Sequence, residues 1–202
     1  MSGTDAELEV AEEDLLRANL YGLLGTLLAK PPEQPLLDSV KTLHGDDSEL
    51  GQAIRALAAA AAATSPEALK DEYFNLFIGI GQGELVPYGS YYLTGFLHEK
   101  PLARLRGDMS RLGIARAEGV KEPEDHIAAL CEMMSGLITG AFGDGPAALD
   151  EQQTFFEQHI GCWAPRFFED LEAAKSAAFY MPVGTIGRLF MAIETEAFDM
   201  AA

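Results

Sequence analysis

Residues 122–140, EPEDHIAALCEMMSGLITG, contain the most regular amphipathic pattern in the sequence. Apolar side chains recur every three or four residues, at Ile127, Leu130, Cys131, Met134, Leu137 and Ile138. This spacing places them on one face of an α-helix. Pro123 fits only the first helical turn, and Gly140 or Gly143 can end the helix. The stretch therefore predicts a long helix with one buried face.

The same helical spacing continues on both sides of this stretch. We expect further helices at about 16–28, 33–43, 48–63, 65–77, 102–112, 147–160, 163–173 and 183–198. Residues 79–90 contain several glycines and a proline, which predict a loop. The chain shows no convincing strand and no repeat of fixed period. These patterns predict an all-α fold, a single irregular helical bundle in which residues 1–202 form one domain.

Acidic residues dominate the charge: 32 Asp and Glu against 14 Lys and Arg give a formal net charge of -18. Such a field repels phosphate backbones and attracts cationic ligands, so we expect no nucleic-acid partner, although solubility alone also explains the charge. Six acids within residues 1–14 predict a solvated helix start or a frayed N-terminus. Six basic residues within 100–121 indicate either a solvated helix or a contact surface for an acidic partner.

The compartment is predicted to be the cytoplasm. The N-terminus has neither a secretory nor a twin-arginine signal, and no apolar run approaches the roughly 20 residues that cross a bilayer, so we expect no membrane insertion. Cys131 and Cys162 are too few for a disulfide framework. His159 and Cys162 could share a metal, but chance explains their spacing better, and we expect no metal and no cofactor.

Enzymatic chemistry has little support in these residues. Ser90 lacks a nucleophile-elbow motif, and His126 has no serine or cysteine partner that spacing predicts, so we expect no catalytic residues. His126 can lie at the rim of the core with one ring nitrogen facing outward, either as a helix cap or as a binding residue. The tyrosines around the 79–90 loop belong to the core or line a groove for a peptide.

Three sequence blocks, in this order, resemble the TorD/DmsD family of redox-enzyme maturation chaperones. They are residues 71–79 (DEYFNLFIG) with 86–92 (VPYGSYY), residues 122–127 (EPEDHI), and residues 155–168 (FFEQHIGCWAPRFF) followed by 179–180 (FY). The resemblance covers most of the chain. It implies an all-helical cytoplasmic chaperone, not an enzyme. Its partners would be the twin-arginine leader and the apo form of a molybdenum or tungsten oxidoreductase, which it would protect from premature export while the cofactor is inserted.

Carried over residue by residue, the resemblance implies a peptide-binding role for eight residues: Leu76, Phe77, Pro87, Tyr88, Ser90, Pro123, Asp125 and His126. A rim carboxylate at Asp125 could pair with a guanidinium, and the aromatic and leucine side chains could contact the apolar half of a leader. The chain departs from the family pattern at Tyr73, at Tyr88 and at residues 130–132. The client is then of the formate dehydrogenase or the DMSO/TMAO reductase type, and the departures favour a formate dehydrogenase.

Alternative functions remain open from the sequence. A helical adaptor would bind a folded partner subunit without recognising a leader, and a small hydrolase would use His126 with Asp125. The resemblance is compatible with a monomer or a domain-swapped homodimer. It is also compatible with binding of a guanine nucleotide or of the molybdenum cofactor, but the sequence contains no nucleotide motif that would assign either.

Overall fold

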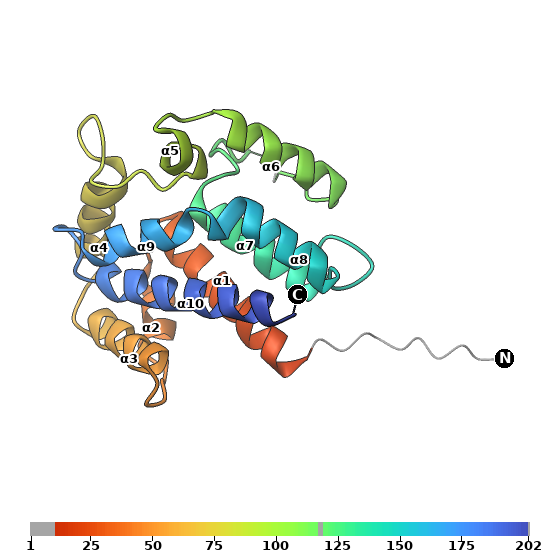
Figure 1. Cartoon of the computed structure of the whole chain (residues 1–202). Helices are drawn as coiled ribbons and strands as arrows, with labels where there is room; N and C mark the ends of the chain where they lie inside the picture. Colours follow the sequence, from red (N-terminus) through yellow and green to blue (C-terminus); the bar gives the residue numbers. More distant parts are fainter. Residues whose placement is uncertain (1–10, 117–118, 202) are drawn as a thin grey trace.

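Helices make up the regular structure of residues 11–116 and 119–201, which are the residues that this computed structural model describes (Figure 1). In chain order they are α1 (Glu12–Ala29), α2 (Gln34–Val40), α3 (Glu49–Ala62), α4 (Pro66–Tyr73), the π-helix η1 (Phe74–Ile78), α5 (Gly89–Thr94), α6 (Lys100–Arg111), α7 (Ile127–Thr139), α8 (Leu149–Phe156), the π-helix η2 (Glu157–Gly161), α9 (Ala164–Glu172) and α10 (Tyr180–Ala201). The predicted all-α fold is confirmed. None of these helices has the length and apolar content of a membrane span.

Several boundaries differ from the sequence prediction. Helix α5 begins at the end of the predicted 79–90 loop, in a part of the chain where no helix was predicted. Two predicted α-helices end in a π-helical turn, at residues 74–78 and 157–161. Most of the predicted frayed N-terminus lies outside the described residues, but Glu12, Glu13 and Asp14 form the first turn of α1, where acidic side chains complement the helix dipole.

Helix α7, which was predicted as a long helix with one buried face, is buried along most of its length. Helices α1 and α8 pack against it, while α3 and α9 pack against α10. Ser135 of α7 donates a hydrogen bond to the carbonyl of Ala18 of α1, at 3.0 Å. A Cβ atom at Gly187 of α10 would lie 2.1 Å from the Phe168 ring of α9. Glycine at position 187 therefore permits the close approach of α9 and α10.

Two distant glutamates hold the connection between α9 and α10. Glu72 of α4 accepts hydrogen bonds from the backbone N–H groups of residues 178, 179 and 180 at 2.8, 3.2 and 2.8 Å. Glu84 accepts from those of residues 175 and 176 at 2.6 and 3.0 Å, and these bonds lower the pKa of its carboxyl group. A carboxylate from α4 thus satisfies N–H groups at the start of α10, where the helix dipole favours negative charge.

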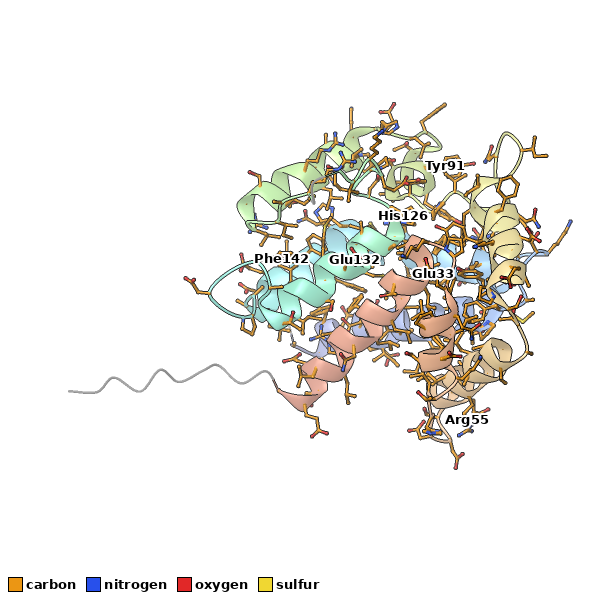
Figure 2. The ribbon with its side chains drawn as sticks, turned by 180° about the vertical axis from the view of Figure 1, so that it is seen from behind. Glu33, Arg55, Tyr91, His126, Glu132 and Phe142 are labelled. Carbon is orange, nitrogen blue, oxygen red and sulfur yellow. The ribbon has the colours of Figure 1, made fainter. Side chains whose placement is uncertain are left out.

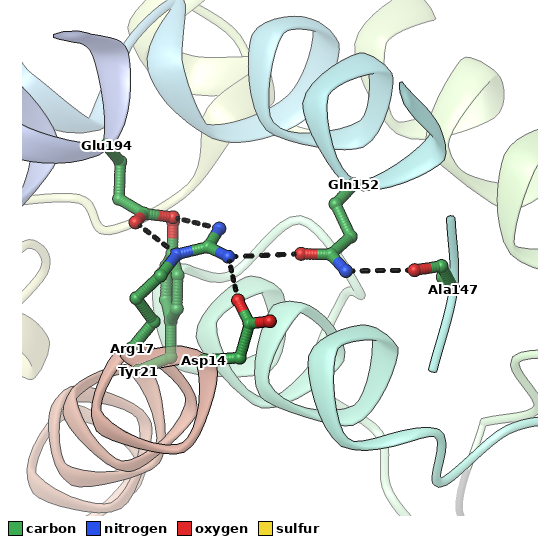
Figure 3. A network of polar contacts seen from close by, with 6 residues as sticks. All are labelled: Asp14, Arg17, Tyr21, Ala147, Gln152 and Glu194. Atoms are coloured by element: carbon green, nitrogen blue, oxygen red, sulfur yellow. Dashed lines mark hydrogen bonds and ion pairs between the residues drawn. The ribbon is translucent and has the colours of Figure 1, made fainter. Parts of the chain in front are cut away.

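An ion pair inside the protein joins the first helix to α10 (Figure 3). The Arg17 guanidinium donates to both carboxylate oxygens of Glu194 at 2.7 and 2.9 Å, and the Tyr21 hydroxyl donates to the same carboxylate at 3.1 Å. The Glu194 side chain is 1% exposed and that of Arg17 is 19% exposed. Arg17 also donates to Asp14, at 2.7 Å, and to Gln152 of α8, at 3.4 Å. The guanidinium therefore connects three helices.

We predict that Arg17→Met lowers the free energy of unfolding by about 3 kcal/mol, because it leaves the Glu194 carboxylate buried without a cation. The double variant Arg17→Met/Glu194→Gln should regain at least about half of that loss, since a neutral amide can still accept from Tyr21. Urea unfolding measures the unfolding free energy of the single and the double variant. The control is Arg166→Met, which removes an exposed ion pair and should cost less than about 0.5 kcal/mol. Equal losses of unfolding free energy for Arg17→Met and Arg166→Met would contradict the stabilising role of the Arg17–Glu194 ion pair.

Candidate functional site

The segment before α7 is paired with the segment before α5. Tyr88 and His126 form an isolated antiparallel bridge. The N–H of residue 89 donates to the carbonyl of residue 125, and the N–H of residue 127 donates to the carbonyl of residue 87, both at 2.9 Å. Six of the eight predicted site residues lie on these two segments. The structure therefore brings together two of the sequence blocks that are far apart in the chain.

Asp125 lies in the interior and not at the rim. The residue is 3% exposed, and its Oδ2 accepts a hydrogen bond from the backbone N–H of Ser90 at 2.7 Å. Oδ1 and the Ser90 hydroxyl are buried without a hydrogen-bond partner among the described residues. The prediction of an accessible carboxylate at Asp125 is wrong, because residues 86–90 cover it. An arginine in solvent does not reach this carboxylate in the conformation shown.

His126 is the N-cap of α7. Its Nδ1 accepts a hydrogen bond from the N–H of Ala128 at 3.1 Å, and the Tyr88 ring packs edge-on against the imidazole with the ring centres 5.0 Å apart. Burial lowers the pKa of His126 to about 4, although the nearby Glu122 and Asp125 carboxylates oppose the shift. His126 is 6% exposed, so the predicted outward-facing rim position is also wrong. Its side chain makes no hydrogen bond to Asp125, unlike the base and orienting carboxylate of a hydrolase.

Glu122 is an exposed acid in the 122–127 sequence block, and it is not among the eight predicted site residues. The Tyr88 hydroxyl donates a hydrogen bond to Oε1 of Glu122. Burial, followed by the effect of this carboxylate, raises the pKa of Tyr88. Because His126 is the N-cap, position 122 lies outside the first turn of α7. The prediction that Pro123 lies in the first helical turn is wrong for the same reason, because α7 begins at Ile127.

The remaining predicted residues differ in accessibility. Leu76 of η1 is fully buried and Pro87 is buried, whereas Phe77 and Pro123 are half-buried. The Phe77 ring packs edge-on against Tyr73, with centres 4.9 Å apart. Burial, and to a smaller degree the Glu122 carboxylate, raises the pKa of Tyr73 to about 12.

Exposed apolar side chains gather in the part of the chain that surrounds this pairing. Six large ones lie between residues 74 and 97: Phe74, Ile78, Ile80, Leu93, Phe96 and Leu97. Ile80 is 99% exposed and stands between Gly79 and Gly81, both of which have positive φ angles. The connections that follow η1 and α5 lie along the same edge of the molecule (Figure 1). We call these six residues the apolar edge.

Part of the basic stretch at residues 100–121 binds the segment before α7. Arg106 of α6 donates to Glu124 from Nε and Nη2, at 3.0 and 2.8 Å, and Arg116 lies 3.7 Å from the same carboxylate. Arg116 also donates to the backbone carbonyl of Glu122. These two arginines therefore act within the protein. In the described part of the chain, no group of three or more His, Cys, Asp or Glu side chains could hold a metal ion, and His159 instead contacts Asp108 at 2.9 Å.

The burial of His126 predicts a pH-dependent stability. The unfolded side chain takes up a proton near its ordinary pKa of 6.5, but the folded one does so only near 4. The unfolded state thus binds more protons between these values, so stability is full above pH 6.5 and falls as the pH drops towards 4. His126→Asn keeps a capping acceptor but does not titrate. Between pH 7 and 5, the wild type should lose about 2 kcal/mol more unfolding free energy than this variant.

Urea unfolding at a series of pH values tests this expectation. The matched control is His44→Asn at an exposed histidine, which should follow the wild-type pH dependence. An unchanged slope in His126→Asn would show that the buried imidazole does not cause the loss at low pH.

Comparisons with known proteins indicate the family of this chain. A family model described as nitrate reductase delta subunit matches residues 43–169. Chaperone protein TorD of Vibrio atlanticus is 27% identical to this chain, over 89% of the chain and 93% of the relative. Chaperone protein TorD of Vibrio parahaemolyticus is 24% identical, over 91% of the chain and 81% of the relative.

A solved structure supports the fold. The crystal structure assigned to a redox enzyme maturation protein from Archaeoglobus fulgidus superposes with a TM-score of 0.58 at 21% identity, over 94% of this chain and 99% of that chain. The hydrolase alternative is wrong, because the curated relatives are chaperones. Since the family model spans more than half of the sequence, the chain belongs to the nitrate reductase delta subunit family, as a TorD-type redox enzyme maturation chaperone.

Proposed function

We propose that this chaperone binds, in the cytoplasm, the twin-arginine leader of a molybdenum or tungsten oxidoreductase. The observation that carries the proposal is the apolar edge, which lies on the same stretch of chain as Tyr88, the hydrogen-bond partner of the exposed acid Glu122, in a chain of net charge -18. Exposed apolar patches of soluble proteins commonly bind partners. A twin-arginine leader combines two cationic side chains with an apolar stretch, so its chemistry complements both features.

The eight predicted site residues contribute in two ways under this proposal. Phe77 and Tyr88 are half-buried and offer aromatic surface to the apolar stretch of the leader. Leu76, Ser90 and Asp125 are buried and position the segments on which those side chains lie. Substituting Asp125 removes the acceptor of the Ser90 N–H, so it alters the fold as well as the leader surface.

Binding of the leader prevents premature export of the client. A leader held on the apolar edge is unavailable to the export machinery until the apo catalytic subunit has received its cofactor. The client is of the formate dehydrogenase or the DMSO/TMAO reductase type, and we favour a formate dehydrogenase. The chaperone acts as a monomer or as a domain-swapped homodimer.

Titration calorimetry of the purified protein with leader peptides tests the proposal. We expect saturable binding to the twin-arginine leader of one client class, among formate dehydrogenase, DMSO reductase and TMAO reductase leaders. If no leader binds but the folded catalytic subunit is captured, the protein is the helical adaptor and the proposal is wrong.

We predict that Ile80→Asp and Phe96→Asp each weaken leader binding about tenfold, because each puts a charge where an apolar contact of roughly 1.5 kcal/mol or more would form. Both side chains are exposed, so the unfolding free energy should change by less than about 0.5 kcal/mol. The matched control is Met200→Asp, the same kind of change at an exposed residue on α10. The same loss of affinity in the control would show that added negative charge, and not the apolar edge, determines binding.

A further inference from the structure

A groove lies along α7 and includes Glu122, the hydrogen-bond partner of Tyr88. It encloses about 270 Å³ between α6, the connection that leads to α7, and α7 itself. Its apolar lining comes from Met109, Ile114, Val120, Met133 and Phe142, and two carboxylates, Glu122 and Glu132, also line it. Figure 2 shows His126 at the start of α7, Glu132 on the helix and Phe142 near its other end. The groove therefore begins at the paired segments of the candidate site and extends away from them.

Both carboxylates are available to a ligand. The Tyr88 hydroxyl occupies Oε1 of Glu122, but Oε2 has no hydrogen-bond or ion-pair partner within residues 11–116 and 119–201. Glu132 is exposed at the surface of α7, and neither of its oxygens has such a partner in that part of the chain. Partial burial raises the pKa of Glu132, as is usual for a carboxylate that no cation compensates.

The other charged side chains that line the groove are paired. Glu124 and Arg116 also line it, but they lie 3.7 Å apart, and Arg106 donates two further hydrogen bonds to Glu124. Arg116 is additionally bound to the carbonyl of Glu122. Within residues 11–116 and 119–201, the groove carboxylates without a cationic partner are those of Glu122 and Glu132. The groove thus complements a ligand with two positive charges and an apolar side chain.

We propose that Glu122 and Glu132 recognise the two arginines of the leader, and that the groove between them takes the apolar side chain next to the arginine pair. This inference rests on the proposed leader-binding function and assigns the residues that give it specificity. Asp125, which the sequence favoured for this role, is buried and bound to Ser90, whereas Oε2 of Glu122 is open.

The geometry suits neighbouring arginines. Consecutive side chains of an extended peptide point in opposite directions, so two adjacent arginines need acids on separate elements. Glu122 lies on the connection before α7, and Glu132 lies on α7. A guanidinium forms parallel hydrogen bonds to a carboxylate that an ammonium group cannot form. Met109 and Met133 give the groove flexible walls, which can accommodate different apolar neighbours.

A double-mutant cycle with the full-length protein tests this inference. The protein arm compares the wild type with Glu122→Gln, Glu132→Gln and the double variant. The peptide arm compares the client leader with one in which both arginines are replaced by glutamine. Each single protein variant should bind the natural leader about three to ten times more weakly, and the double variant should show a smaller salt dependence. All of the proteins should bind the glutamine leader within about twofold of one another.

The control variant is Glu196→Gln, which removes one exposed negative charge on α10 and should bind the natural leader like the wild type. If the wild type prefers the arginine leader and both groove variants bind it unchanged, the groove assignment is overturned while leader binding stands. Equal losses for the arginine and glutamine leaders also overturn it, because the acids then act independently of the arginines. If the wild type binds no leader, the proposed function itself fails.

Discussion

The N–H groups in the first turn of α7 lie inside the protein, where solvent water does not accept hydrogen bonds from them. The chain satisfies two of them internally. Ile127 donates to the carbonyl of Pro87, and Ala128 donates to the His126 imidazole. The first of these bonds holds residues 86–90 across residues 122–126. The arrangement of the whole candidate site follows from the burial of this one helix terminus.

Covering the helix terminus divides the site into an interior layer and a surface layer. Ser90 and Asp125 bond to each other in the interior, while Tyr88 and Glu122 meet at the surface above them. The arginines of α6 and of the following connection fix Glu124 from the other side. The protein exposes apolar side chains between residues 74 and 97, and a strong net charge favours the solubility of a protein with such a surface.

Helical periodicity predicted most of the helices and the buried face of α7, because it depends only on local spacing. Helix α5 was missed, since its six residues directly follow a glycine-rich loop and are too few to show a period. The positions of Asp125 and His126 could not be predicted, because residues 86–90, 35 positions away, cover them. The pairing of Tyr88 with Glu122 spans 34 positions, so no local pattern indicates it.

The Arg17–Glu194 ion pair has a consequence for biosynthesis. Its partners are 177 positions apart, and Glu72 contacts a backbone group 108 positions ahead of it. Because the ribosome adds residues from the N-terminus, α1 and α4 leave the tunnel long before α10 exists to neutralise Arg17 or to occupy Glu72. Contacts of such long sequence separation also form late in folding. The segment that carries the apolar edge is therefore translated early, but its neighbouring helix α4 acquires its last contacts only when α10 docks.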